Sequence, residues 1–433
     1  MDIVLIGGIV VPPAMAGAAP GASSPYIEKS RLLCDAGDFW GSLEAIEVGA
    51  AALPDDAGIH SQKSRLLSRL GRHSGALDAA LWAISLEPGR ADAHSACAVA
   101  QASLGRYKDA LESAQRSLEI SPRLVEAHTV RAAALVALGR NDEALASFKR
   151  AVGLEPGVST LRGNLALALH NMGRHGDAHE ELDGAIEMDG KSSRLYKIRA
   201  VVRKHTGPPE ASLLDLRHAM DLDPNDATTH FDMGLELAEL GRDEEAAESF
   251  GRAADISPGH AKAHMNRARC LLRLQMYEDA LDPLGRVIYI APTAETHMNR
   301  AGVLGVLGRD ADAAADFERA IALDPNRARA HAGRGLALFR LGRNKEAMEE
   351  LNTALYMDPS VPTANAIKAQ MLACDGRHRE ALESFKLEAS ISPNDPETRL
   401  GMAEALLHLD RNAEALEEAD FVLEQDSGRP LAH

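Results

Sequence analysis

The chain has 433 residues, of which 45% are hydrophobic but only 4% aromatic, a composition that favours close-packed helices over a sheet protein. Its formal net charge of −17 argues against general affinity for nucleic acid or anionic membranes, so we predict neither a nucleic-acid partner nor stable membrane insertion. The four cysteines show no CxxC or metal-finger spacing and are predicted to be free thiols, which favours a cytoplasmic location.

The N-terminal segment 1–22 differs from the rest of the chain. An apolar run from Ile3 to Val11 precedes Pro12-Pro13 and several small residues. A secretory signal would carry basic residues before such a run, but the only charged residue there is Asp2. We therefore expect a disordered or loosely docked N-terminus, and a cleaved signal on an exported protein is the alternative.

From residue 23 onward the sequence repeats with a period of 34 residues. A proline recurs at that spacing, first at Pro54 and Pro88, and a glycine recurs midway, as at Gly71 and Gly105. Between the punctuating residues lie two helical patterns, each with one apolar stripe. A pair of such helices cannot bury its own apolar surface, so each pair needs copies of itself on both sides.

This helix–turn–helix unit, with glycine, alanine and proline at fixed offsets, resembles the tetratricopeptide repeat (TPR) family. The resemblance implies an all-α fold, a right-handed superhelical α-solenoid of antiparallel helix pairs. It also implies that the first helices line a concave groove that holds an extended or helical peptide. Twelve repeats fit, followed by the start of an incomplete thirteenth at 430–433: 23–56, 57–90, 91–124, 125–158, 159–192, 193–226, 227–260, 261–293, 294–327, 328–361, 362–395 and 396–429.

Two places depart from the repeat. The repeat 261–293 is one residue short, has Gln275 in place of the glycine, and carries Pro283 inside its second helix, so we expect a change of superhelical pitch near residues 275–293. In this sequence no polar capping helix follows the last repeat. We expect either that the array is truncated or that its final apolar face, predicted from Leu406, Leu416 and Val422, is covered by a partner or by a second copy of the chain through self-association.

Residue types that often carry chemistry recur here at repeat positions. Histidines such as His94 and His264 share one position, where a packing role between helices is favoured over metal binding. Arginines at another position are predicted to pair with Asp215, Asp316 and Glu350 on the second helices. The sequence contains no nucleophile motif and no phosphate-binding loop, so we predict a protein that is not an enzyme and needs no cofactor or metal.

In the TPR family the second, fifth, ninth, twelfth and thirteenth residues of each repeat face the groove. Over repeats 193–361 these positions hold eight Lys or Arg against two Glu, with apolar residues between them. A groove lined with one sign of charge favours an acidic or phosphorylated peptide with apolar anchors. The predicted peptide-binding residues are Arg194, Lys197, Lys204, His205, Phe231, Lys262, Met265, Arg269, Arg273, Met298, Arg329, Phe339 and Arg340.

One TPR subclass holds C-terminal carboxylates with a two-lysine clamp, and Lys197 and Lys262 occupy its lysine positions. The clamp also requires asparagines where this chain has Val201 and Asp232, so that mode is not expected here. The leading hypothesis is a non-enzymatic scaffold or adaptor with an acidic protein or peptide partner. The alternative is the regulatory or substrate-recruiting half of an enzyme, such as a glycosyltransferase, whose catalytic part lies on another or a missing chain.

Overall fold

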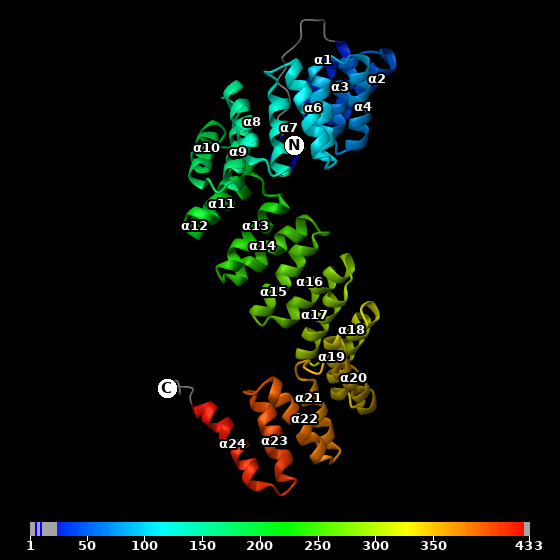
Figure 1. The fold of residues 1–433 in the computed structure, drawn as a ribbon, viewed down its shortest axis with the longest axis vertical. Coiled ribbons are helices and arrows are strands. Elements are labelled where there is room, and N and C mark those ends of the chain that lie inside the picture. Colours follow the sequence, from blue (N-terminus) through cyan, green and yellow to red (C-terminus); the bar gives the residue numbers. More distant parts are fainter. Residues whose placement is uncertain (1–4, 7–8, 11–23, 428–433) are drawn as a thin grey trace. The chain divides into compact units, whose positions relative to one another are not determined.

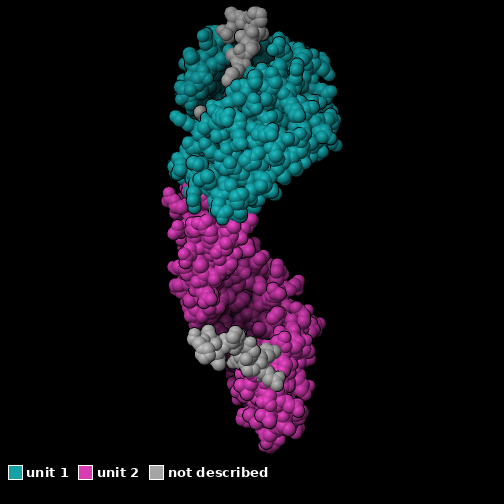
Figure 2. Space-filling model, turned by 90° about the vertical axis from the view of Figure 1, so that its left-hand side faces the viewer, with its two compact units in different colours: residues 1–225 teal, residues 226–433 magenta. Residues whose placement is uncertain are grey.

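The computed structural model describes residues 5–6, 9–10 and 24–427 of the chain. Apart from one pair of two-residue strands, the described residues form an all-α array of antiparallel helix pairs, as predicted (Figure 1). The rest of the segment 1–22 and the predicted thirteenth repeat at 430–433 lie outside the described residues. The chain divides into two compact units, residues 1–225 and 226–433 (Figure 2).

The first unit holds the strand pair, in which Leu5 lies opposite Val10 and Ile6 opposite Ile9. β1 contacts α5, and β2 contacts α9. The elements of this unit are β1 (Leu5–Ile6), β2 (Ile9–Val10), α1 (Pro25–Asp35), α2 (Phe39–Ala52), α3 (Ala57–Arg69), α4 (His73–Leu86), α5 (Ala91–Ser103), α6 (Tyr107–Ile120), α7 (Val125–Ala137), α8 (Asn141–Leu154), α9 (Ser159–Asn171), α10 (His175–Met188), α11 (Ser193–Thr206) and α12 (Pro209–Leu222).

The second unit continues the same alternation of a first and a second helix in each repeat. Its helices are α13 (Ala227–Glu239), α14 (Asp243–Ile256), α15 (Ala261–Arg273), α16 (Tyr277–Ile290), α17 (Ala294–Val306), α18 (Asp310–Leu323), α19 (Ala328–Arg340), α20 (Asn344–Met357), α21 (Ala364–Cys374), α22 (His378–Ile391), α23 (Pro396–Leu407) and α24 (Asn412–Ser427).

The recurring small residues explain how the helices pack so closely. The alanine near the start of most second helices is fully buried, as at Ala144, Ala246 and Ala313. A methyl group there lets neighbouring backbones approach, and a larger side chain would force them apart. In most repeats the midway glycine turns the chain between the two helices with φ near +75°, a conformation that glycine adopts without strain, whereas Gly207 has φ −131°. Gln275 holds the same turn at φ 59° without being a glycine.

The shortened repeat loses its residue from a loop, and its second helix stays continuous. α16 runs without interruption through Pro283, whose side chain is buried. The loop to α17 comprises residues 291–293, whereas the loop before α15 comprises residues 257–260. Thr293 caps α17 and shares a reciprocal capping box with Thr296, which offers one reason why the shorter loop is tolerated. The expected change of superhelical pitch stays a prediction.

Within each unit several first helices of neighbouring repeats touch one another. α3 contacts α5, α5 contacts α7, and in the second unit α17 contacts α19. Among the described residues, the second helices of neighbouring repeats make no comparable contact. The first helices therefore lie on the inner side of the stacked pairs, and we call their solvent-facing side the inner face.

Candidate peptide-binding surface

In the first unit the predicted residues lie on α11, and two of them are engaged by the preceding repeat. Arg194 donates from Nη2 to Asn164 Oδ1 of α9 at 2.8 Å, and burial lowers its pKa to about 10. Lys197 is half-buried, whereas Lys204 is exposed. The Arg194 guanidinium thus contributes to packing between repeats as much as to the surface.

His205 belongs to a cluster of three imidazoles that the sequence analysis did not anticipate. Its ring centroid lies 5.1 Å from that of His170 and 5.4 Å from that of His175. The Nδ1 atoms of His170 and His175 are 3.1 Å apart. Burial, followed by the charges of His175 and His205, lowers the pKa of His170. The cluster joins α9 and α10 to α11 of the following repeat.

The apolar residues predicted as anchors in the second unit are all half-buried. Phe231 packs against the ring of Phe250 at 5.5 Å and against His260 at 4.7 Å. Met265, Met298 and Phe339 each pack against a buried cluster of their own repeat. Each of these side chains is covered by the protein on one side and exposed on the other, so a ligand could contact only the exposed side.

The predicted cations of the second unit fall into two groups. Arg273 Nη2 forms an ion pair with Asp243, and Arg340 Nη1 lies 3.5 Å from Asp310 Oδ1 and donates to Gly305 O at 2.8 Å. The remaining cations, Lys262, Arg269 and Arg329, are exposed, and within the described part of the chain none of them forms an ion pair.

These ion pairs follow a rule that runs through the array. The thirteenth residue of a repeat meets the first residue of the preceding second helix, 30 residues earlier: Arg273 with Asp243, Arg340 with Asp310, His205 with His175, and His408 with His378. The aspartates were missed because they lie outside the five groove positions considered. The constant separation of 30 residues is the signal that could have found them.

The recurring histidines and arginines form contacts that join helices and loops of the repeats. The Nε2 atoms of His60, His94, His128, His264 and His331 donate to proline carbonyl oxygens at 2.7–3.2 Å, which joins each first helix to the preceding loop. No group of three or more potential metal-binding side chains occurs among the described residues. The arginine–acid pairs are confirmed at Arg199–Asp215, Arg300–Asp316 and Arg334–Glu350, with N···O distances of 2.6–3.2 Å.

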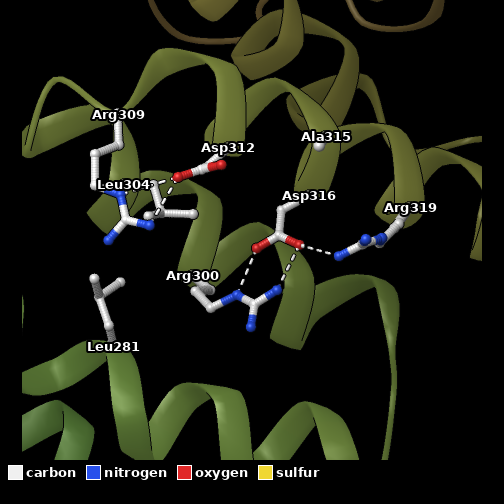
Figure 3. A pocket seen from close by; sticks show the side chains of 8 residues that line it. All are labelled: Leu281, Arg300, Leu304, Arg309, Asp312, Ala315, Asp316 and Arg319. Carbon is white, nitrogen blue, oxygen red and sulfur yellow. Dashed lines mark hydrogen bonds and ion pairs between the residues drawn. The ribbon is translucent and has the colours of Figure 1, made fainter.

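Figure 3 shows one of these pairs in a pocket of about 300 Å³ between α16, α17 and α18. Arg300 meets Asp316 through two hydrogen bonds, of 2.6 and 2.8 Å, and Arg319 reaches the same carboxylate at 3.2 Å. Arg309 meets Asp312 at 2.7 Å. The arginines that line this pocket are thus held by aspartates, and we assign the cluster to the coupling of α17 and α18.

Comparison with protein families gives the same picture. Sequence models described as tetratricopeptide repeats match residues 62–124, 231–295 and 303–362, residues 135–202, and residues 396–420. The chain belongs to the tetratricopeptide repeat family. Proteins of this family mediate protein–protein interactions and are generally non-catalytic scaffolds. No curated protein matches the chain.

A search of solved structures found several that are similar to this TPR protein. The APC/C hetero-tetramer Cut9–Hcn1 is 15% identical, with 94% of this chain and 88% of that chain covered and a TM-score of 0.45. A TPR protein from Parabacteroides merdae is 18% identical, with 57% and 97% covered and a TM-score of 0.46. YrrB, described as having an unusual peptide-binding site, is 23% identical, with 42% and 94% covered and a TM-score of 0.34.

Among the described residues, no helix has both the length and the apolar character needed to cross a membrane.

Proposed function

We propose that this TPR protein is a non-enzymatic scaffold that binds an acidic or phosphorylated peptide on the inner face of its second unit. The supporting observation is that exposed cations stand at groove positions in a protein of net charge −17. Lys262 and Arg269 are seven residues apart on α15, so they share one face of that helix. Arg329 stands near the start of α19.

α17 lies between α15 and α19 in the sequence and has no cation at its groove positions. It contributes Glu295 together with small and apolar residues. A matching peptide therefore carries acidic groups at its two ends and uncharged or apolar residues in the middle. The half-buried Met265, Met298 and Phe339 supply apolar contact between the charged ends.

The test is to reverse together the three exposed groove cations of the second unit that form no ion pair among the described residues, as Lys262→Glu, Arg269→Glu and Arg329→Glu. Losing three attractive contacts and gaining three repulsive ones should weaken binding of an acidic peptide on the order of 100-fold. Affinity is measured by fluorescence anisotropy with labelled Glu- or phosphoserine-rich peptides, at low and at physiological salt. If charge drives binding, the affinity of the wild type should fall from low to physiological salt, because salt screens attraction between exposed charges.

The matched control makes the same change of charge on second helices of the same unit, as Arg252→Glu, Arg286→Glu and Lys345→Glu. All three residues are exposed. This control should bind like the wild type. Equal binding by both triple variants, or equal loss in both, would show that the inner face has no special role.

Self-association through the last helix pair is a second part of this proposal. Leu416 and Leu423 on α24 are 62% and 65% exposed, whereas Leu406 is buried within its own helix pair and does not belong to the open face. Changing Leu416 and Leu423 to Glu should remove any concentration-dependent mass in light scattering, and Leu387→Glu on α22 serves as control. A wild-type protein that stays monomeric at high concentration contradicts this part.

The cysteines support a reducing compartment. All four are free thiols, and burial raises the pKa of Cys97 and of Cys270, which keeps those two protonated. Cytoplasmic residence is therefore part of the proposal.

A further inference from the structure

α17 carries two glycines that packing within the protein does not require. A Cβ atom added at Gly302 or Gly305 would meet no atom within 4 Å. Glycine destabilises a helix relative to alanine, so a glycine with free space beside it has a cost without an internal reason. At Gly335 and Gly401 the reason is visible, because a Cβ there would lie 2.8 Å from Leu351 or 2.4 Å from Phe385.

The space beside the two glycines is a pocket. It is bounded by α17, by the first half of α18 and by α19, and it has a volume of about 160 Å³. Its walls include Val306, Phe317 and Leu336, and its only charged lining residues are Asp310 and Arg340. A cavity of roughly 150 Å³ holds a molecule the size of benzene, so this pocket fits one side chain.

The pocket opens on the face where the proposed peptide lies. Gly302, Gly305 and Val306 occupy three of the five groove positions of their repeat. Val306 is 63% exposed at the edge of the pocket. The Arg340 guanidinium bridges the same edge, because it donates to Gly305 O and lies beside Asp310.

The charges around the pocket restrict its occupant. Arg340 and Asp310 neutralise each other, which leaves the walls without a net charge to hold an ionised side chain. Asp310 Oδ1 is covered and lies 3.5 Å from Arg340 Nη1, so it is not open to an incoming charged group. Arg329 lies on α19, which also supplies Leu336 and Arg340 to the pocket, and Lys262 and Arg269 lie on α15.

We infer that this pocket receives one aliphatic side chain, of leucine or methionine size, from the acidic peptide. This inference rests on the proposed function and specifies its ligand as a peptide with an apolar residue between acidic segments. The glycines of α17 are the specificity-determining residues, since any side chain at Gly302 would occupy the space that the ligand needs.

The experiment fills the pocket from within. Leucine at position 302, as Gly302→Leu, starts from a Cβ in open space and should not disturb the fold. The control is Gly153→Leu on α8, another exposed helical glycine whose Cβ would meet nothing within 4 Å. Circular dichroism should show equal helix content for both variants, and Gly305→Leu provides a second variant that fills the pocket.

The probes are two labelled peptides of glutamate and serine that differ only at the centre, where one has leucine and the other serine. The wild type should bind the leucine peptide on the order of 10- to 100-fold more tightly, because one aliphatic side chain is buried. In Gly302→Leu this preference for the leucine peptide over the serine peptide should vanish, whereas Gly153→Leu should keep the preference of the wild type.

The outcomes separate this inference from the proposed function. Equal binding of both peptides by the wild type, with loss on reversal of the three cations, would overturn the pocket and leave the acidic-peptide function intact. A preference for leucine that survives in both Gly302→Leu and Gly305→Leu would also overturn the pocket. If neither peptide binds, the proposed function fails, and the pocket inference fails with it.

Discussion

Replacing Phe250 by alanine should lower the stability of the α13–α15 region by about 4 kcal/mol. Phe250 is 1% exposed, and its ring lies against the backbone of Gly234, where a Cβ would be 2.7 Å away. Truncation leaves a cavity that these closely packed helices can fill only in part. Phe231, a residue of the candidate surface, rests on the same ring and should lose its position.

The matched control is Phe317→Ala, at the equivalent place in the repeat that carries the pocket. Phe317 is half-buried and borders open space, so its truncation should cost clearly less. Because a repeat array unfolds in parts, hydrogen exchange resolved to individual helices is the appropriate measurement, together with urea unfolding. Equal losses in the two variants would mean that burial in the repeat core does not set the stability of this region.

Replacing Asp316 by alanine should destabilise the α17–α18 pair by about 3 kcal/mol. Asp316 is 1% exposed and accepts hydrogen bonds from Arg300 and from the His297 imidazole (Figure 3 shows Arg300). Its removal leaves a half-buried guanidinium without its carboxylate. Replacing both partners, as Arg300→Met with Asp316→Leu, should recover most of the loss, since no buried charge is then left unpaired.

The contribution of Asp316 should depend on pH in a defined direction. Burial alone would raise its pKa, but the hydrogen bonds and charge of Arg300, with help from His297, outweigh burial and hold the pKa below its ordinary value of 3.8. A carboxyl with a depressed pKa in the folded state stabilises the protein above its unfolded pKa and loses that effect as the pH falls through the folded pKa.

The stability difference between wild type and Asp316→Ala should therefore be constant at neutral pH and shrink below pH 3.8. Urea midpoints over this range measure it, with Glu346→Ala as a control in the exposed pair with Arg343, where no measurable loss is expected. A difference that persists unchanged in acid would mean that charge does not account for the effect of Asp316.

The candidate surface shows where reasoning from the sequence stops. The arginine–acid pairs inside each repeat were predictable, because both partners obey the period and lie on two helices joined by a short turn. The pairing of Arg273 and Arg340 was not predicted, because each partner belongs to the second helix of the preceding repeat. The contacts of His205 with His170 and His175 were missed because both of those residues belong to the preceding repeat.

The sequence by itself determined the repeat, the helix pairs and the family, because small residues, turn glycines and prolines act locally and recur at a constant period. Only the tertiary structure decided which groove cations form ion pairs, since that depends on which acids neighbouring repeats bring within reach. It also decided that Gly302 and Gly305 border a pocket, because whether a glycine leaves space depends on how closely the side chains of neighbouring helices approach it.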